Sequence, residues 1–92
     1  MKSKAKTQRN HAIRRFKERF NITLNKDQYL QLCKRFKKQI NTRDGVTFVE
    51  RQSNRVKVWD THINEIPIRV VWDKKRQAIA TVLYPDKEGV YE

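Results

Sequence analysis

A histidine and an arginine one helical turn apart are the residues of this sequence best suited to chemistry. His11 and Arg15 lie four positions apart in a stretch with helical spacing, so both side chains project from one face. A histidine can transfer a proton, and a guanidinium can stabilise the charge that develops on phosphorus. Such a pair suits metal-independent RNA cleavage, in which the ribose 2′-hydroxyl attacks the adjacent phosphate. The simpler alternative, a surface histidine among solvated arginines, stays open.

Other side chains could hold the phosphate or a base. Arginine binds phosphate through two parallel N–H donors, and Arg15, Arg51, Arg55 and Arg69 are candidates for this clamp. Trp59 has two interpretations, stacking on a base or covering sheet surface, and the second is favoured. The other histidine, near a hairpin turn, has no obvious partner, and we interpret it as structural.

Several other classes of site are not indicated. The single cysteine, Cys33, excludes an intramolecular disulfide and a thiolate zinc site, and it fits a reducing cytoplasm. Only two glycines occur, which leaves no glycine-rich phosphate loop. The strand carboxylates Glu50, Asp60 and Asp73 have no spacing that would converge them on a metal. We therefore expect no cofactor and no metal.

Positive charge is concentrated in the first half of the chain. Residues 1–44 contain 14 Lys and Arg against three acidic residues, whereas residues 45–92 contain eight against seven. A net charge of +12 is tolerated best when the partner is a polyanion, so we expect an RNA or DNA phosphate backbone and no membrane. The expected nucleic-acid-binding residues are Arg14, Arg19, Lys34, Arg35, Lys37, Lys38, Arg51, Arg55 and Lys57.

The basic half of the chain predicts two helices. Residues 1–9 are interpreted as a flexible basic arm, and the first helix is expected over residues 10–20, with Phe16 in its buried stripe. The second helix is expected to begin after Asn25, which can form a capping box with Gln28, and to end near residue 41.

After Gly45 the sequence changes from helical to alternating periodicity, which predicts strands. In the second strand, Val56 and Val58 are assigned to the core face, and Lys57 and Trp59 to the other face. The four strands are expected at residues 46–51, 55–60, 66–72 and 78–83.

These elements predict an α+β fold, in which two N-terminal helices pack on one face of a four-stranded antiparallel meander sheet. One domain covers residues 10–85, and residues 86–92 form a frayed tail. The face of the sheet away from the helices is expected to be open, with Lys57, Arg69 and Thr81 projecting from it. The expected shared core contains Phe16, Phe36, Val58, Val70 and Trp72.

Two short motifs carry a resemblance to a known family. The segment HAIRRFKERFNI, residues 11–22, and the strand segments IRVVWD, residues 68–73, and ATVL, residues 80–83, are similar to small phage and mobile-element members of the RelE/ParE toxin superfamily. That superfamily shares a metal-independent ribonuclease fold with barnase and colicin-type nucleases. Unlike RelE-type toxins, this chain shows no strand before the first helix. The resemblance implies active-site candidates at His11, Arg15, Arg51, Arg55, Arg69 and Thr81, and the catalytic set we favour is His11, Arg15, Arg69 and Thr81.

We therefore expect an RNA-binding cytoplasmic protein of phage or mobile-element origin, which in the first hypothesis is a toxin-like, metal-independent endoribonuclease. The alternative is a non-catalytic accessory or anti-defence protein that binds nucleic acid or a host nucleoprotein. A third hypothesis is binding to a protein partner, such as an acidic antitoxin.

Overall fold

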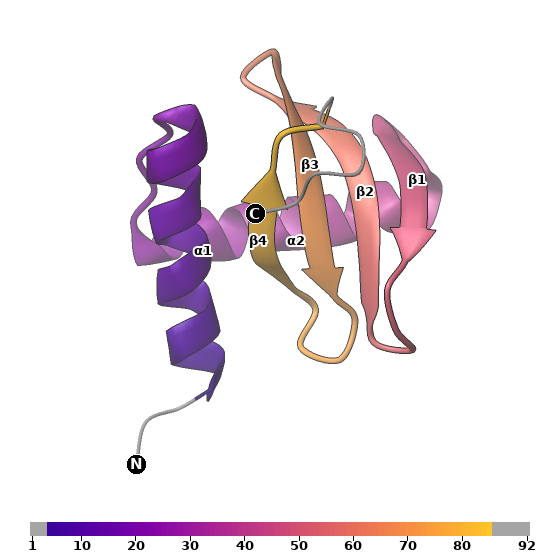
Figure 1. The fold of residues 1–92 in the computed structure, drawn as a ribbon, viewed down its shortest axis with the longest axis horizontal. Coiled ribbons are helices and arrows are strands. Elements are labelled where there is room, and N and C mark those ends of the chain that lie inside the picture. The colour runs from indigo at the N-terminus through magenta and orange to yellow at the C-terminus, as the bar shows by residue number, and fades with distance from the viewer. Residues whose placement is uncertain (1–3, 86–92) are drawn as a thin grey trace.

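The computed structural model describes residues 4–85, which form two helices followed by four strands (Figure 1). Helix α1 lies alongside strand β4, and α2 crosses behind the sheet (Figure 1). The strands form one antiparallel sheet in the order β1-β2-β3-β4, so the predicted α+β fold class is confirmed. The elements are α1 (Lys4–Phe20), α2 (Lys26–Thr42), β1 (Val46–Arg51), β2 (Val56–Ile63), β3 (Ile66–Asp73) and β4 (Ala78–Leu83).

Helix α1 begins at Lys4, six residues before the predicted start. The predicted flexible arm is therefore wrong for residues 4–9, while residues 1–3 and the predicted tail, residues 86–92, lie outside the described residues. The added segment contacts the sheet, because Gln8 Nε2 donates to Asp73 Oδ2 at 3.0 Å. The sequence does not predict this start for two reasons. The contact joins residues that are far apart in the sequence, and the first turn has no acidic side chain, which is a usual signal of a helix N-terminus.

Helix α2 begins where its capping signal predicts. Asn25 Oδ1 accepts a hydrogen bond from Gln28 N at 2.8 Å, and Gln28 Oε1 accepts one from Asn25 N at 2.9 Å. Tyr29, one turn into the helix, donates from its hydroxyl to the Ile79 carbonyl at 2.6 Å. The helix is capped by Arg43 in the left-handed conformation, with φ at 58°. Side-chain packing therefore holds α2 against β4 from its first turn.

Two apolar clusters lie on opposite faces of the sheet. The larger one fills the space between the sheet and both helices, and its most buried members include Ala12, Phe16, Tyr29, Phe36, Trp59, Ile68, Val70, Trp72, Ile79 and Val82. The smaller one consists of Val58, Val71 and Leu83, with Val49, Val56 and Ala80 packed against it. The face away from the helices is thus partly apolar, although a single basic, open face was expected.

The predicted orientation of β2 is wrong. Trp59 lies in the larger core at 2 % exposure, and Lys57 shares its face, whereas Val58 belongs to the smaller cluster. The other four members of the expected shared core do lie together. Both alternating sets of residues in this strand are apolar enough to be buried. The alternation therefore does not show which set faces the helices. The indole fills the wider space beside the helices, where the Phe48 ring packs against it edge-on at 5.3 Å between centroids.

Candidate nucleic-acid interface

The exposed face of α2 is basic, as the helical spacing predicts. Its only acidic residue is Asp27, in the first turn. The three salt bridges among the described residues involve no residue of this helix. The exposed basic residues of α2 are Lys26, Lys34, Arg35, Lys37 and Lys38. This helix therefore presents charge that no carboxylate of residues 4–85 neutralises.

A groove runs between α2 and the end of the sheet that carries the β3–β4 turn; we call it the α2 groove. It consists of two adjoining cavities of about 350 and 380 Å³, which share Lys37 and Gln77 as lining residues. The basic residues of the first, the tryptophan cavity, are Lys37, Arg43, Lys57 and Lys74. The basic residues of the second, the arginine cavity, are Arg9, Lys34, Lys37 and Arg76. Among the described residues, no Asp or Glu lines either cavity.

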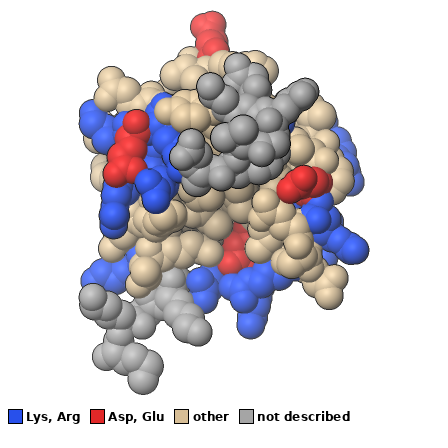
Figure 2. Space-filling model, in the orientation of Figure 1, with Lys and Arg blue, Asp and Glu red and all other residues tan. Residues whose placement is uncertain are grey.

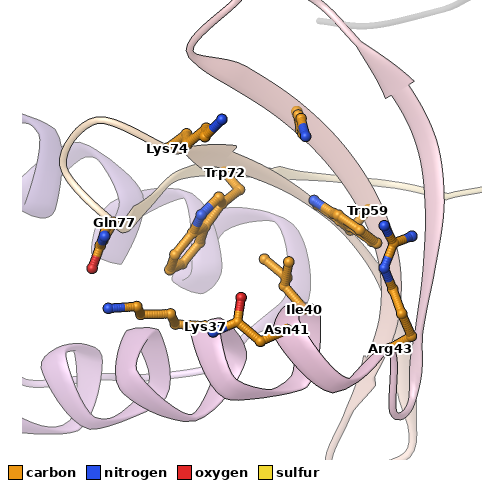
Figure 3. A pocket seen from close by; sticks show the side chains of 9 residues that line it. Lys37, Ile40, Asn41, Arg43, Trp59, Trp72, Lys74 and Gln77 are labelled. Atoms are coloured by element: carbon orange, nitrogen blue, oxygen red, sulfur yellow. The ribbon is translucent and has the colours of Figure 1, made fainter.

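The tryptophan cavity lies between two indole rings and the end of α2 (Figure 3). Trp59 and Trp72, from β2 and β3, are the two tryptophans of the chain, and Lys37 and Asn41 face them from the helix. The Arg43 guanidinium lies 5.1 Å from the centre of the Trp59 ring, which is cation–π geometry. A cation of the helix cap is thus already held beside the cavity.

Two buried side-chain N–H groups of the described residues have no hydrogen-bond partner, and each belongs to a residue that lines one of these cavities. They are Trp59 Nε1 and Arg9 Nε. In Figure 3 the nitrogen edge of Trp59 points towards Ile40 and Trp72, across the cavity. A buried donor without an acceptor costs roughly 1–3 kcal/mol. An acceptor on a ligand in the α2 groove would therefore be stabilising at these two points.

The predicted catalytic pair, His11 and Arg15, lies on the side of α1 that is hydrogen-bonded to the sheet. Gln8 donates to a β3 carboxylate at 3.0 Å, and Arg19 Nη1 donates to the Val82 carbonyl at 2.9 Å. His11 and Arg15 lie between these two anchors at helical spacing, so they belong to the same side of the helix. The sequence therefore placed this pair correctly on one face.

The electrostatics of this side of α1 favour a neutral imidazole. Partial burial lowers the pKa of His11 below 6.5, and the charges of Arg15, Arg14 and Arg19 lower it further, against a smaller opposing effect of Glu18. Arg15 itself donates to Glu18 at 2.8 Å. His11 can therefore accept a proton near neutral pH.

The other two predicted catalytic residues lie on the sheet face away from the helices. Arg69 is 9 % exposed, and its Nε and Nη2 donate to the two oxygens of Asp60 at 2.8 and 3.1 Å. Thr81 pairs with Val71 across β3 and β4, and Val71 belongs to the cluster on this face. The Arg69 guanidinium is held by a carboxylate, which makes it a poor phosphate clamp. The predicted catalytic set thus comes from two places, α1 and the sheet.

Arg55 is also held by a carboxylate. It donates from Nε and Nη2 to Asp73 at 3.2 and 2.9 Å. Burial raises the pKa of Asp73, but hydrogen bonds from Arg55, Gln8 and the backbone of the following turn outweigh it and lower the pKa to about 2. Arg51, by contrast, lies exposed at the end of β1, opposite Lys57 in the register of the sheet.

Figure 2 shows the face of the molecule opposite the α2 groove. Lys and Arg lie around the edge of this face, and residues of other kinds occupy most of its described middle. Arg55 and Arg69, unlike the cations of the α2 groove, form ion pairs.

The α2 groove contains only part of the predicted binding set. Lys34, Lys37 and Lys57 line it, whereas Arg35 and Lys38 are exposed elsewhere on α2. Arg14 and Arg19 lie on α1. Sequence reasoning missed Arg43, Lys74 and Arg76, and it placed Arg9 in a flexible basic arm, whereas Arg9 belongs to α1. The run of basic residues at 74–76 was a usable signal, but only the folded chain brings that turn against α2.

Comparison with models of known protein families, with curated proteins and with solved structures gives no match. The resemblance to RelE/ParE toxins therefore stays a prediction. Within residues 4–85, no helix is long and apolar enough to cross a membrane. Within the same residues, no group of three or more His, Cys, Asp and Glu side chains is placed to hold a metal ion.

Proposed function

We propose that this protein is a cytoplasmic RNA-binding protein that holds a single strand along the α2 groove. One observation supports this proposal above the others: two adjoining cavities carry basic residues from α1, α2, β2 and the β3–β4 turn, and no acidic residue of the described chain lines them. Cations gathered in this way repel one another, and a polyanion that enters the groove removes that repulsion.

The dimensions of the α2 groove favour a single strand over a duplex. Its cavities, of about 350 and 380 Å³, lie near the lower end of the roughly 300–1,000 Å³ range of small-ligand sites. Each therefore has room for about one nucleotide. The tryptophans are 2 % and 5 % exposed, so they offer ring edges to a ligand and no open stacking face.

The test is a salt titration of RNA binding. A labelled single-stranded RNA of about 12 nucleotides, which fits the usual site sizes, is titrated with protein between about 50 and 200 mM salt. Replacing Lys34, Lys37 and Lys74 by Gln is expected to reduce the log–log salt slope by about 2, at roughly 0.7 for each lost phosphate contact. A DNA strand of the same sequence shows whether the sugar contributes.

The matched control removes the same charge outside the α2 groove. Lys26, Lys38 and Lys75 are exposed and line neither cavity, and their replacement by Gln should leave most of the slope intact. Equal losses in the two triple variants would show that overall charge, and not the groove, binds RNA.

A second candidate function is metal-independent endoribonuclease activity. It is favoured by the placement of His11 and Arg15 one turn apart on α1, where burial and the neighbouring arginines lower the pKa of His11. The expected outcome is RNA cleavage that persists in EDTA, leaves a 2′,3′-cyclic phosphate and spares DNA, because the ribose hydroxyl is the nucleophile. His11→Ala should abolish cleavage and leave RNA binding within about twofold, since a neutral imidazole adds no charge to the contact. Binding without cleavage under all conditions would leave the non-catalytic function.

A further inference from the structure

We infer that the tryptophan cavity binds one nucleotide that bears a terminal phosphomonoester. The inference rests on the proposed function, because it assigns a ligand to one end of the α2 groove. The shared chemistry is a phosphomonoester on a nucleoside, and its source is either the end of an RNA strand or a free mononucleotide.

The charge of the cavity suits a dianion. Lys37 and Arg43 come from α2 and its C-cap, Lys57 comes from β2 and Lys74 from the β3–β4 turn, and all four line one space of about 350 Å³. None of them takes part in a salt bridge of the described residues, and no carboxylate of those residues lines the cavity. A phosphomonoester carries a charge of about −1.5 to −2 near neutral pH. An internal phosphodiester carries a single negative charge, so the monoester matches this group of cations better.

The hydrogen-bonding groups of the cavity suit both parts of a nucleotide. The Trp59 indole N–H suits a phosphate oxygen, and two side-chain amides suit the nucleoside. Trp59 is 2 % exposed, and its Nε1 is buried without a partner among the described residues. Figure 3 shows that nitrogen directed towards Trp72, across the cavity. Asn41 and Gln77 add amide groups that both donate and accept hydrogen bonds, as recognition of a base or ribose requires.

Part of this arrangement is held in place by other contacts. Arg43 caps α2 and lies over the Trp59 ring, and the Phe36 ring packs against Trp72 at 5.4 Å between centroids. The cation and both indoles are therefore packed against neighbouring groups before a ligand enters. A preorganised site loses less conformational freedom on binding.

The first experiment uses intrinsic fluorescence, because both tryptophans of the chain line this cavity. Adenosine 5′-monophosphate is titrated into the full chain at constant ionic strength, with adenosine as the control. We expect a saturable change in tryptophan emission with the nucleotide and none with the nucleoside. Trp59→Phe keeps an aromatic ring but removes the N–H donor, and it should weaken nucleotide binding about tenfold, as expected for a charge-assisted hydrogen bond.

The second experiment distinguishes the two sources of the ligand. Short RNA strands that carry a 5′-phosphate, a 3′-phosphate or hydroxyl groups at both ends are compared at one salt concentration. Preference of about tenfold for a phosphorylated end would assign the strand terminus. Binding of the free nucleotide with no such preference would assign the mononucleotide, and either result supports the site.

Matched lysines keep the inference separate from the proposed function. Lys74 lines the cavity and its neighbour Lys75 does not, so Lys74→Gln should remove the preference for the phosphomonoester and Lys75→Gln should retain it. Equal affinity for all three RNA ends, together with no fluorescence response to the nucleotide, would overturn the inference while RNA binding stands. Absence of RNA binding in every arm would instead overturn the proposed function. Thermal unfolding of each variant confirms that it is folded.

Discussion

Three arginines outside the tryptophan cavity, Arg15, Arg55 and Arg69, differ from the basic residues of that cavity in one respect, which is the presence of a carboxylate. Arg15, Arg55 and Arg69 each donate to an acidic side chain at 2.8–2.9 Å. None of the four basic residues that line the tryptophan cavity takes part in such a pair within the described chain. The three arginines are thus neutralised by a carboxylate, whereas the four cations of the cavity are not.

Ion pairing with a carboxylate limits which cations are available to a ligand. A guanidinium that already satisfies a buried carboxylate must leave that carboxylate unpaired before it can bind phosphate, and an unpaired buried charge is costly. A lysine in a groove without acidic residues has only to lose its bound water when it contacts phosphate. We therefore expect Arg55 and Arg69 to affect stability and the α2 groove to affect binding.

The largest expected effect is on stability, in the pair of Asp60 and Arg69. Asp60→Ala leaves the 9 % exposed Arg69 guanidinium without its carboxylate. Loss of one partner of a buried pair costs roughly 3–5 kcal/mol, and because Asp60 is itself one-third exposed we expect about 2–3 kcal/mol. Urea unfolding measures the loss. Asp60→Asn, which keeps an acceptor, should cost less, and a large drop in RNA affinity of the folded variant would contradict a purely structural role.

The next effect is on the acid stability that Asp73 provides. Its pKa in the folded chain is about 2, below the ordinary value of 3.8. The stabilisation is therefore complete above the ordinary pKa, and it is lost as the pH falls towards 2. Because Arg55 is partly exposed, we expect about 1–2 kcal/mol. Asp73→Asn should flatten the dependence of unfolding free energy on pH between about 5 and 2, and an unchanged slope would refute the assignment.

A smaller effect separates two neighbouring lysines of the β3–β4 turn. Lys74 lines the tryptophan cavity and Lys75 does not, although the concentration of charge in residues 1–44 predicts little effect from either. We expect Lys74→Gln to weaken RNA binding about fivefold at moderate salt and Lys75→Gln to weaken it less than about twofold. Equal values, measured by fluorescence anisotropy, would favour the charge distribution of the sequence over the α2 groove.

The smallest effect is on the titration of His11. Burial and the neighbouring charge of Arg15 lower its pKa. Arg15→Gln removes the largest of the charge effects, so the pKa of His11 should rise. The imidazole signals in NMR spectra measure it. A pKa that does not move would show that the charge of Arg15 does not contribute.

The local structure of this protein follows from its sequence. The capping pair Asn25 and Gln28 marks the start of α2, and the side chains that follow at helical spacing separate a buried stripe from a basic face. Alternating periodicity after Gly45 gave β1 and β4 with their observed bounds, and the short linkers made the sheet a meander. These features depend on hydrogen bonds and periodicities within a few residues, so they are visible in the sequence.

The contacts between distant residues, by contrast, depend on how the elements pack together. Lys57 and Trp59 belong to the helix-facing side of β2 because the space beside α2 accommodates an indole, whereas the valines of the same strand suit the opposite face. The basic turn at residues 74–76 reaches α2 through the packing of β3 and β4, and Gln8 reaches Asp73 across 65 positions of the chain. When two faces of a strand have similar hydrophobicity, either can pack against the helices. Periodicity and composition do not distinguish these two arrangements.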